Sequence, residues 1–264
     1  MNLFKQFFIF IYFFFISTLV LNTFNKSVDK FFLPTDMVYI PGDAYLLLFK
    51  EKGNIIRHEV SYFFVDKYPI TNEKYLNFLR LNKKWEPRLI ISFFSNKDYL
   101  TNWFLNENFF LIYENPVVGI PWYSALAYCK MFNKRLPTID EWEYMSSVAD
   151  KSYVGISSPQ YIQKILNWYI NSIGKNRYSI KTMFGNYWNI FGLHGIIWEW
   201  VYDFNSIIGL KSENTNNIEQ LLFCGAATEN SINPIDYVGF MRFAFRNSLD
   251  SIFSISSLGF RCVR

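Results

Sequence analysis

Cysteine, histidine and clustered positive charge are all scarce in this chain. Its 264 residues include 3 cysteines and 2 histidines, and no run of basic residues is longer than two. Nucleic-acid binding requires clustered cations, so we expect no nucleic-acid partner. The sequence also lacks a glycine-rich phosphate loop, a serine nucleophile elbow and a His-Glu-x-x-His helix. These absences argue against the enzyme classes that those motifs define.

Apolar residues are abundant instead. They make up 51% of the chain, of which a large share is aromatic, whereas charged residues make up 18%. This length and composition suit one domain with a large core and a terminal tail.

The first 25 residues are predicted to form a signal anchor, that is, a transmembrane helix. The stretch Phe7–Leu21 contains no charge, with Lys5 before it and Lys26 after it. As a helix it is only about 22 Å long, so a span of the roughly 30 Å hydrocarbon core needs the flanks Leu3–Phe24 as well. A cleaved signal peptide is the alternative, but no Ala-x-Ala-like site follows. No cysteine follows either, which excludes a bacterial lipoprotein, and in both cases we expect the domain on the extracytoplasmic side.

The rest of the chain is predicted to form a polar linker over residues 26–35 and one domain over residues 36–264. Its patterns indicate strands in 37–49, interrupted by Pro41-Gly42, and in 58–66, a short buried strand near 119, and helices over 72–80, 123–133 and 160–169. Thr138 and Glu141 have the spacing of a capping box, which predicts a further helix start. The inner face of helix 123–133 is predicted to include Trp122, Ala125, Leu126, Cys129 and Met131.

Residues 81–116 are rich in Trp, Phe and Tyr. Trp103, Phe104, Phe109, Phe110 and Tyr113 are expected either to form an exposed aromatic surface or to cover the core beneath a long loop, and we favour the second arrangement. Residues 150–188 form a second, mostly polar segment.

Seven blocks, taken together, resemble the formylglycine-generating enzyme (sulfatase-modifying factor) family. In chain order they are Met37–Gly42 with Val65–Asn72, Val118–Trp122, Ala127–Cys129, Lys134–Thr138, Glu141–Tyr144, Phe191–Leu193 with Trp198–Trp200, and Leu258–Cys262. The resemblance implies an α+β fold, a variant of the C-type-lectin-like domain with much irregular backbone. It also implies a structural motif that consists of Trp122, Arg135, Glu141, Trp142, Trp198, Glu199, Trp200, Arg246 and Arg261.

The cysteines of the family match only in part. Enzymatic members oxidise a cysteine of a sulfatase with two copper(I)-binding cysteines near the C-terminus, because copper(I) selects soft thiolates. The matching segment here follows Cys224, and residues 228–261 contain no cysteine. We therefore expect no catalytic residue and no copper. The resemblance also implies a disulfide between Cys129 and Cys262, with two reduced buried cysteines as the alternative. Cys224 is then unpaired, and we favour a small buried apolar role for it over a reactive thiol. A second family disulfide, near Met145 and Phe243, is missing.

The family's calcium turn is also altered. Residues 192–200 lack about three positions, including the acidic one, and Ile196 stands where asparagine is usual. Calcium takes six to eight oxygen ligands, and Glu199 is the clear ligand left, so we expect no bound calcium and expect Glu199 to accept hydrogen bonds from loop amides. Arg246 is expected to form an ion pair in the core, with Asp203 as one candidate partner.

Two histidines cannot form the three-histidine iron site of the related sulfoxide synthases. A site of two histidines and one carboxylate is possible by count, but the positions of His58 at a strand start and His194 in a turn argue against it. The sequence thus predicts a noncatalytic, membrane-anchored extracytoplasmic accessory or structural subunit of a membrane protein complex. The alternatives are a formylglycine-generating copper oxidoreductase and a lectin-like module that binds sugar or peptide.

Overall fold

The part of the chain described below comprises residues 36–46, 57–104, 112–149, 159–172, 179–180, 183–206 and 234–264 of a computed structural model. The predicted anchor, the linker over 26–35 and Cys224 lie outside these residues. Among them, no helix is both long and apolar enough to cross a membrane. The residues from Val38 to Arg264 belong to one compact unit.

Short strands pair to form three two-stranded sheets. β1 (Met37–Ile40) pairs with β4 (Phe63–Asp66), β2 (Asp43–Leu46) with β3 (Arg57–Val60), and β5 (Trp198–Glu199) with β6 (Leu258–Gly259). β2 and β3 are antiparallel, whereas β5 and β6 are parallel. The predicted break at Pro41-Gly42 is confirmed, since it separates β1 from β2. A Cβ atom on Gly42 would lie 2.8 Å from the amide nitrogen of Tyr62, so a larger residue would force these turns apart.

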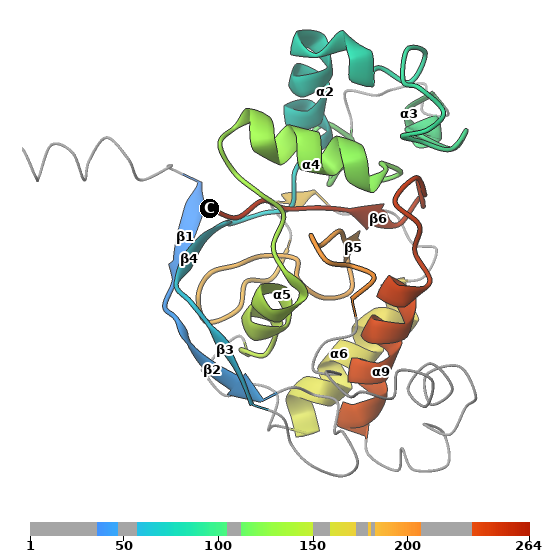
Figure 1. Cartoon of the computed structure of the whole chain (residues 1–264). Coiled ribbons are helices and arrows are strands. Elements are labelled where there is room, and N and C mark those ends of the chain that lie inside the picture. Colours follow the sequence, from blue (N-terminus) through green and yellow to red (C-terminus); the bar gives the residue numbers. More distant parts are fainter. Residues whose placement is uncertain are drawn as a thin grey trace, which may run out of the picture. The chain divides into compact units, whose positions relative to one another are not determined.

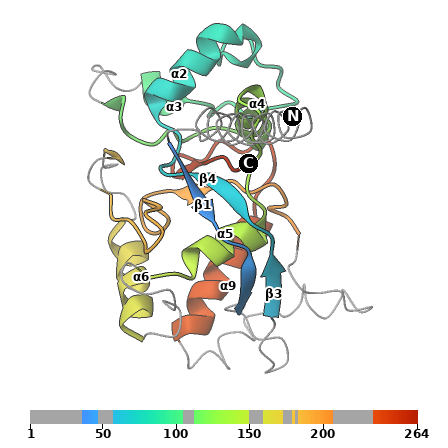
Figure 2. The same ribbon diagram turned by 90° about the vertical axis from the view of Figure 1, so that its left-hand side faces the viewer.

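The helices lie at two ends of this unit. They are α2 (Asn72–Leu81), the short 3₁₀ helix η1 (Lys83–Trp85), α3 (Thr101–Phe104), α4 (Trp122–Met131), α5 (Ile139–Ser146), α6 (Pro159–Ser172) and α9 (Pro234–Asn247). Figure 1 shows α2, α3 and α4 at one end, α6 and α9 side by side at the other, and α5 between them. The same separation is visible after a quarter turn (Figure 2).

Two predicted helix starts are confirmed by their caps. The Thr71 hydroxyl accepts a hydrogen bond from the amide of Lys74, and this begins α2. At α5 the Thr138 hydroxyl accepts from the amide of Glu141, whose carboxylate accepts from the amide of Thr138. This reciprocal pair is the predicted capping box, and it satisfies two amides that a helix start would otherwise leave unbonded.

The elements differ from the expectations in three places. The buried side chains of α4 are Ser124, Ala125, Tyr128 and Cys129, whereas Met131 is 39% exposed. Ala125 and Cys129 are buried as predicted, and Trp122 and Leu126 pack partly buried against the core. The predicted inner face is therefore wrong for Met131, and it omits Ser124 and Tyr128. The backbone before α4 is buried but forms no strand; its amides bond to isolated carbonyls, such as that of Ile70. The helix α9 was not predicted.

The C-terminal segment 258–264 fastens several distant parts of the domain together. Val263 forms bridges with both Val65 and Arg135, and the backbone groups of Arg264 and Phe64 bond to each other. One residue earlier, Cys262 forms the predicted disulfide with Cys129, with Cα atoms 5.7 Å apart. Both half-cystines are fully buried. The disulfide therefore fixes the end of the chain to α4 inside the core.

Candidate functional site

The family blocks meet at a buried ion pair between β5 and the C-terminal segment. Both oxygens of Glu199 accept hydrogen bonds from the guanidinium of Arg261 at 2.7 to 3.0 Å, and the side chains of both residues are 0% exposed. The indole nitrogen of Trp142 donates to the same carboxylate at 2.8 Å. The expectation that loop amides bind Glu199 is therefore wrong: two side chains, from the end of the chain and from α5, occupy its oxygens.

The backbone around this pair is closely packed. Glu199 lies opposite Gly259 in the parallel β5–β6 pair. A Cβ atom on Gly259 would stand 2.2 Å from the carbonyl oxygen of Val117. Because that neighbour is backbone, it cannot move aside as a flexible side chain can, and the close approach requires glycine. The glycine thus lets β6 approach near enough to bring Arg261 to Glu199.

A second buried carboxylate, Glu143, lies two residues after Glu141 on α5 and binds two arginines. Arg242 and Arg246, one helical turn apart on α9, each donate to one of its oxygens at 2.6 Å. Side-chain exposure is 2% for Glu143, 0% for Arg242 and 4% for Arg246. We call these three residues the Glu143 triad. Arg246 does form an ion pair in the core as expected, but its partner is not Asp203, which instead accepts from the amide of Ile139 at 2.8 Å.

Charge and aromatic contact link the two carboxylates into one region. The guanidinium of Arg246 lies 4.6 Å from the ring centroid of Trp142, and that of Arg242 lies 5.5 Å from it. Burial alone would raise the pKa of Glu143, but the charges of the two arginines outweigh it and hold this pKa below the usual value. Glu143 is therefore ionised at neutral pH, and it is not a general acid.

The remaining motif residues support this region from its edges. Arg135 donates to both oxygens of Glu141 at 2.6 Å, with 45% of its side chain exposed. The indoles of Trp122 and Trp200 donate to backbone carbonyls of Val201 and Ile120. The ring of Trp198 stacks on a phenylalanine of α9, with centroids 4.2 Å apart. All of these contacts hold helices, strands and loops in place, and the polar groups named here bond to the protein rather than point into a cavity.

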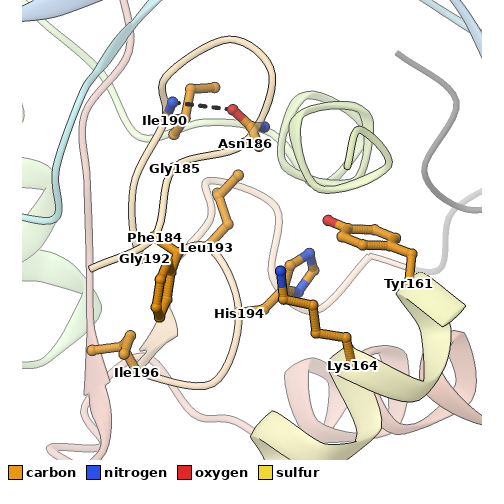
Figure 3. A pocket seen from close by; sticks show the side chains of 10 residues that line it. All are labelled: Tyr161, Lys164, Phe184, Gly185, Asn186, Ile190, Gly192, Leu193, His194 and Ile196. Carbon is orange, nitrogen blue, oxygen red and sulfur yellow. Dashed lines mark hydrogen bonds between the residues drawn. The ribbon is translucent and has the colours of Figure 1, made fainter. Parts of the chain in front are cut away.

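A small pocket adjoins the buried region, between α6 and the loop over residues 183–196. Tyr161, Lys164, Phe184, His194 and Ile196 are among its lining residues, as Figure 3 shows. Its volume is about 50 Å³, enough for a few water molecules, whereas sites for small organic ligands are about 300–1,000 Å³. Asn186 shapes the loop by accepting from the amide of Ile190 at 3.0 Å, the bond drawn in Figure 3.

The histidine in this pocket does not carry a charge at neutral pH. Burial, and then the charge of Arg242, lower the pKa of His194 from 6.5 to about 3. Its Nε2 lies 3.1 Å from the carbonyl oxygen of Ser146, and a carbonyl can only accept, so the neutral ring is protonated on Nε2. The other histidine, His58, is in β3 and its Nδ1 lies 3.0 Å from Asp140. The structure thus gives the two histidines separate partners.

The residues of this chain that match the family's copper(I) and calcium sites do not suit those metals. Copper(I) requires two thiolates, and the disulfide consumes two of the three cysteines. Calcium would need the oxygens of Glu199, which the guanidinium of Arg261 already holds. In the described part of the chain, no group of three or more His, Cys, Asp or Glu side chains could hold a metal ion.

Sequence reasoning missed the Glu143 triad. The family resemblance includes Glu143 only as part of the Glu141–Tyr144 block, and it makes no prediction for Arg242. A signal was present, since Arg242 and Arg246 are four residues apart, the spacing that puts two side chains on one face of a helix. The positions of the absent second disulfide, Met145 and Phe243, both lie in the apolar core.

Fold, motif and disulfide define a domain of the sulfatase-modifying class. Residues 25–264 match the family described as the sulfatase-modifying factor enzyme 1-like domain, and the chain belongs to this family. One curated relative is the serine/threonine-protein kinase pkn1 of Chlamydia caviae, 27% identical over 195 residues, which are 67% of this chain but 30% of that protein. The chain therefore spans about a third of that relative's length.

Solved structures give the same fold. PvdO from Pseudomonas aeruginosa superposes with a TM-score of 0.50 at 15% identity, covering 86% of this chain and 93% of that one. Treponema denticola variable protein 1 superposes with a TM-score of 0.50 at 15% identity, covering 86% and 94%. At this identity the similarity concerns the fold alone.

Proposed function

We propose that this chain is a noncatalytic accessory or structural subunit of a membrane protein complex, held at the membrane by its N-terminal segment with its domain on the extracytoplasmic side. The kinase activity in the name of pkn1 is not part of the proposal. The present chain matches 30% of that protein, and its sequence has no glycine-rich phosphate loop.

The observation that carries the proposal is the use of the cysteines. Cys129 and Cys262 are bonded and fully buried, so Cys224 is the one thiol left in the sequence. One thiol cannot form the two-thiolate copper site on which the family's oxidation depends. The family's reaction would thus need ligands that the cysteine content of this chain does not supply.

The polar interior supports the same interpretation. A catalytic acid or base is accessible to substrate from a cleft, whereas Glu199 and Glu143 are buried and form ion pairs with arginines. The adjoining pocket of about 50 Å³ is too small for a peptide substrate. We infer that the charged side chains hold the elements in place, and that the surface supplies the function.

The disulfide and the N-terminal sequence support the location. Disulfides persist in oxidising compartments and are rare in the cytosol, so the Cys129–Cys262 bond favours an extracytoplasmic domain. The uncharged stretch Phe7–Leu21 between lysines favours a membrane attachment. Both arguments agree on a domain tethered outside the cytoplasm.

The test is to extract the native full-length protein in mild detergent, separate complexes by size and identify the co-migrating proteins by mass spectrometry. The same fraction is analysed for copper and calcium. The proposal expects a stable set of membrane proteins, peptides from the extreme N-terminus and no stoichiometric metal. A protein that migrates alone with about one copper per chain would overturn it and favour the oxidoreductase.

Two controls sharpen this result. Thiol titration of the unfolded protein should give one thiol before reduction and three after it, if the disulfide forms as described. The variant Cys224→Ser should leave the set of partners unchanged. If that variant instead loses a bound copper, then Cys224 is a metal ligand and the noncatalytic proposal fails.

A further inference from the structure

An exposed apolar ridge follows α2. Four large apolar side chains project from residues 81–93, and their exposed fractions are 71% for Leu81, 57% for Leu89, 65% for Ile91 and 69% for Phe93. We call these four residues the apolar ridge. Single exposed apolar residues are ordinary, but several on one short segment indicate an interaction surface.

The ridge stands on a packed base rather than on a loose loop. The ring of Trp85 lies 5.9 Å from that of Phe94, which in turn lies 5.1 Å from Tyr123 at the start of α4. The hydroxyl of Tyr99 donates to the carbonyl of Trp85 at 2.8 Å. Trp85 and Ile90 pack against the main core. The inner residues therefore hold the segment in one conformation. Of the four ridge residues, Phe93 adds to this packing, since its ring lies 5.2 Å from that of Phe94 and 6.3 Å from that of Tyr123, while 69% of Phe93 remains exposed.

Cations outnumber carboxylates in the segment that carries the ridge, with four basic residues against Glu86 and Asp98. Lys83, Lys84, Arg88 and Lys97 are all exposed, and within the described part of the chain none of them forms an ion pair. The end of α4 continues this surface. Met131 and Phe132, 39% and 45% exposed, follow the exposed Lys130, and the side-chain amide of Asn82 contacts the sulfur of Met131 at 2.9 Å.

This combination distinguishes between two kinds of partner. Lysine is depleted in the cores of protein–protein interfaces. At a membrane surface, by contrast, apolar side chains enter the boundary between headgroups and acyl chains while lysine and arginine extend their charges to the headgroups. Unpaired cations also complement anionic lipid, and each one near the surface strengthens binding about fivefold. The charge around the ridge therefore favours a lipid surface over a protein.

We propose that the apolar ridge docks on a membrane that contains anionic lipid, with Leu89, Ile91 and Phe93 in the interfacial layer and Lys83, Lys84 and Arg88 at the phosphates. This proposal rests on the membrane location in the proposed function, and it adds a second contact to the N-terminal one. A domain attached at two points is oriented relative to the bilayer, whereas a domain on a single tether is not. The surface around α6 and α9, at the other end in Figure 1, would then be available to protein partners.

The test uses the full chain with Cys224→Ser, reconstituted into vesicles. The exposed Ser92, inside the ridge, is changed to cysteine and labelled with an environment-sensitive fluorophore. The matched control carries the label at Glu59→Cys, an exposed position on β3. Vesicles consist of phosphatidylcholine alone or mixed with phosphatidylglycerol, with or without brominated acyl chains that quench fluorophores in the interface.

The proposal expects the label at position 92 to shift to shorter wavelength and to be quenched by brominated lipid in vesicles with phosphatidylglycerol, while the label at position 59 does neither. Each charge reversal among Lys83→Glu, Lys84→Glu and Arg88→Glu should weaken this docking about fivefold or more. The triple change Leu89→Ser, Ile91→Ser and Phe93→Ser should abolish it with an unchanged far-ultraviolet circular dichroism spectrum, because these side chains are 57–69% exposed and the backbone hydrogen bonds do not depend on them.

The outcomes separate this proposal from the proposed function. If the chain floats with vesicles but the label at position 92 stays in water, the ridge does not dock on lipid and only this inference fails. If the chain does not associate with vesicles at all, the membrane location itself is wrong and both fail. Equal signals at positions 92 and 59 would also overturn the ridge as the contact.

Discussion

The sharpest test of the buried polar region is the substitution Glu143→Gln. Glutamine keeps the shape of the side chain but removes its charge, so Arg242 and Arg246 lose their common counter-ion while they are 0% and 4% exposed. Breaking a buried ion pair by removing one partner costs about 3–5 kcal/mol, since the other charge is left without compensation. Here two guanidiniums lose one carboxylate, and we expect a loss of about 4 kcal/mol, against a total of about 5–15 kcal/mol for a typical domain.

The same helix offers a matched control. Glu141→Gln, two residues earlier, also removes a charge from a carboxylate paired with arginine. Its partner Arg135 is 45% exposed, and glutamine at this third helical position still completes the capping box. Glu141 itself is 10% exposed, but solvent reaches the pair from the Arg135 side, and pairs open to solvent contribute about 0–1 kcal/mol, so we expect a loss of about 1 kcal/mol.

The assay is urea unfolding of the full chain in mild detergent, followed by tryptophan fluorescence. Glu143→Gln should lower the midpoint by about 1 M or more, and Glu141→Gln by much less. Equal shifts for the two variants would refute the reasoning, because the contribution of an ion pair to the free energy of unfolding would then not depend on its burial. An unchanged slope in both variants is needed for the comparison to measure stability alone.

Three further results are expected. His194 is neutral in the folded state, with its pKa at about 3 instead of 6.5, so below pH 6.5 the unfolded state binds a proton that the folded state does not. The free energy of unfolding should therefore fall by about 2 kcal/mol from pH 6.5 to 5, and by less in His194→Gln. A flat pH profile in the native protein would contradict this. Glu143 changes stability only around and below its unfolded pKa of 4.5, as the pH falls toward its lower folded pKa, so the two effects overlap below pH 4.5 and the fall between pH 6.5 and 5 reports His194. Gly259→Ala should lower the free energy of unfolding by about 3 kcal/mol, because its new Cβ atom meets backbone. Gly185→Ala, whose Cβ atom meets a phenylalanine ring at 3.0 Å, should lower it by about 1 kcal/mol in the same urea assay. A larger loss for Gly185→Ala would contradict the described packing. Removing the disulfide with Cys129→Ala and Cys262→Ala should lower the free energy of unfolding by about 5 kcal/mol, because the bond closes a loop with a sequence separation of 133 and so restricts the unfolded chain. The shift in thermal midpoint measures this loss, and a loss under 1 kcal/mol would contradict it.

Local signals in the sequence predicted local structure well. Thr71 and Thr138 begin helices because the cap depends on residues within one turn, and Pro41-Gly42 separates strands because it restricts its own backbone. The predicted inner face of α4 omits Ser124, because a polar side chain can be buried when its hydroxyl finds a partner. The hydroxyl of Ser124 bonds to the carbonyl of Pro121 at 3.0 Å, a contact that hydrophobicity alone does not indicate.

Long-range polar pairing was predicted only where the family resemblance supplied it. The disulfide follows from matched cysteines, but Glu143 and Arg242 are 99 residues apart, and many acidic residues were equally plausible partners for each arginine. The choice depends on the packing of α5 against α9, and α9 itself was not predicted. Glu199 was assigned amide donors for the same reason, since its real donors come from residues 142 and 261.

The contacts of residues 258–264 also limit when the domain can complete its folding during synthesis. Three residues of this segment emerge from the ribosome after almost everything they bind: Arg261, the partner of Glu199, Cys262, the partner of Cys129, and Val263, which forms the bridges to Val65 and Arg135. The nascent domain therefore cannot close while it is being synthesised, and it must wait with a reduced Cys129 and an unpaired Glu199. A chain that terminates before Leu258 lacks both partners, so its Cys129 stays reduced and its Glu199 stays without Arg261. Such products would differ chemically from finished ones, which gives proofreading chaperones and proteases a simple basis for telling them apart.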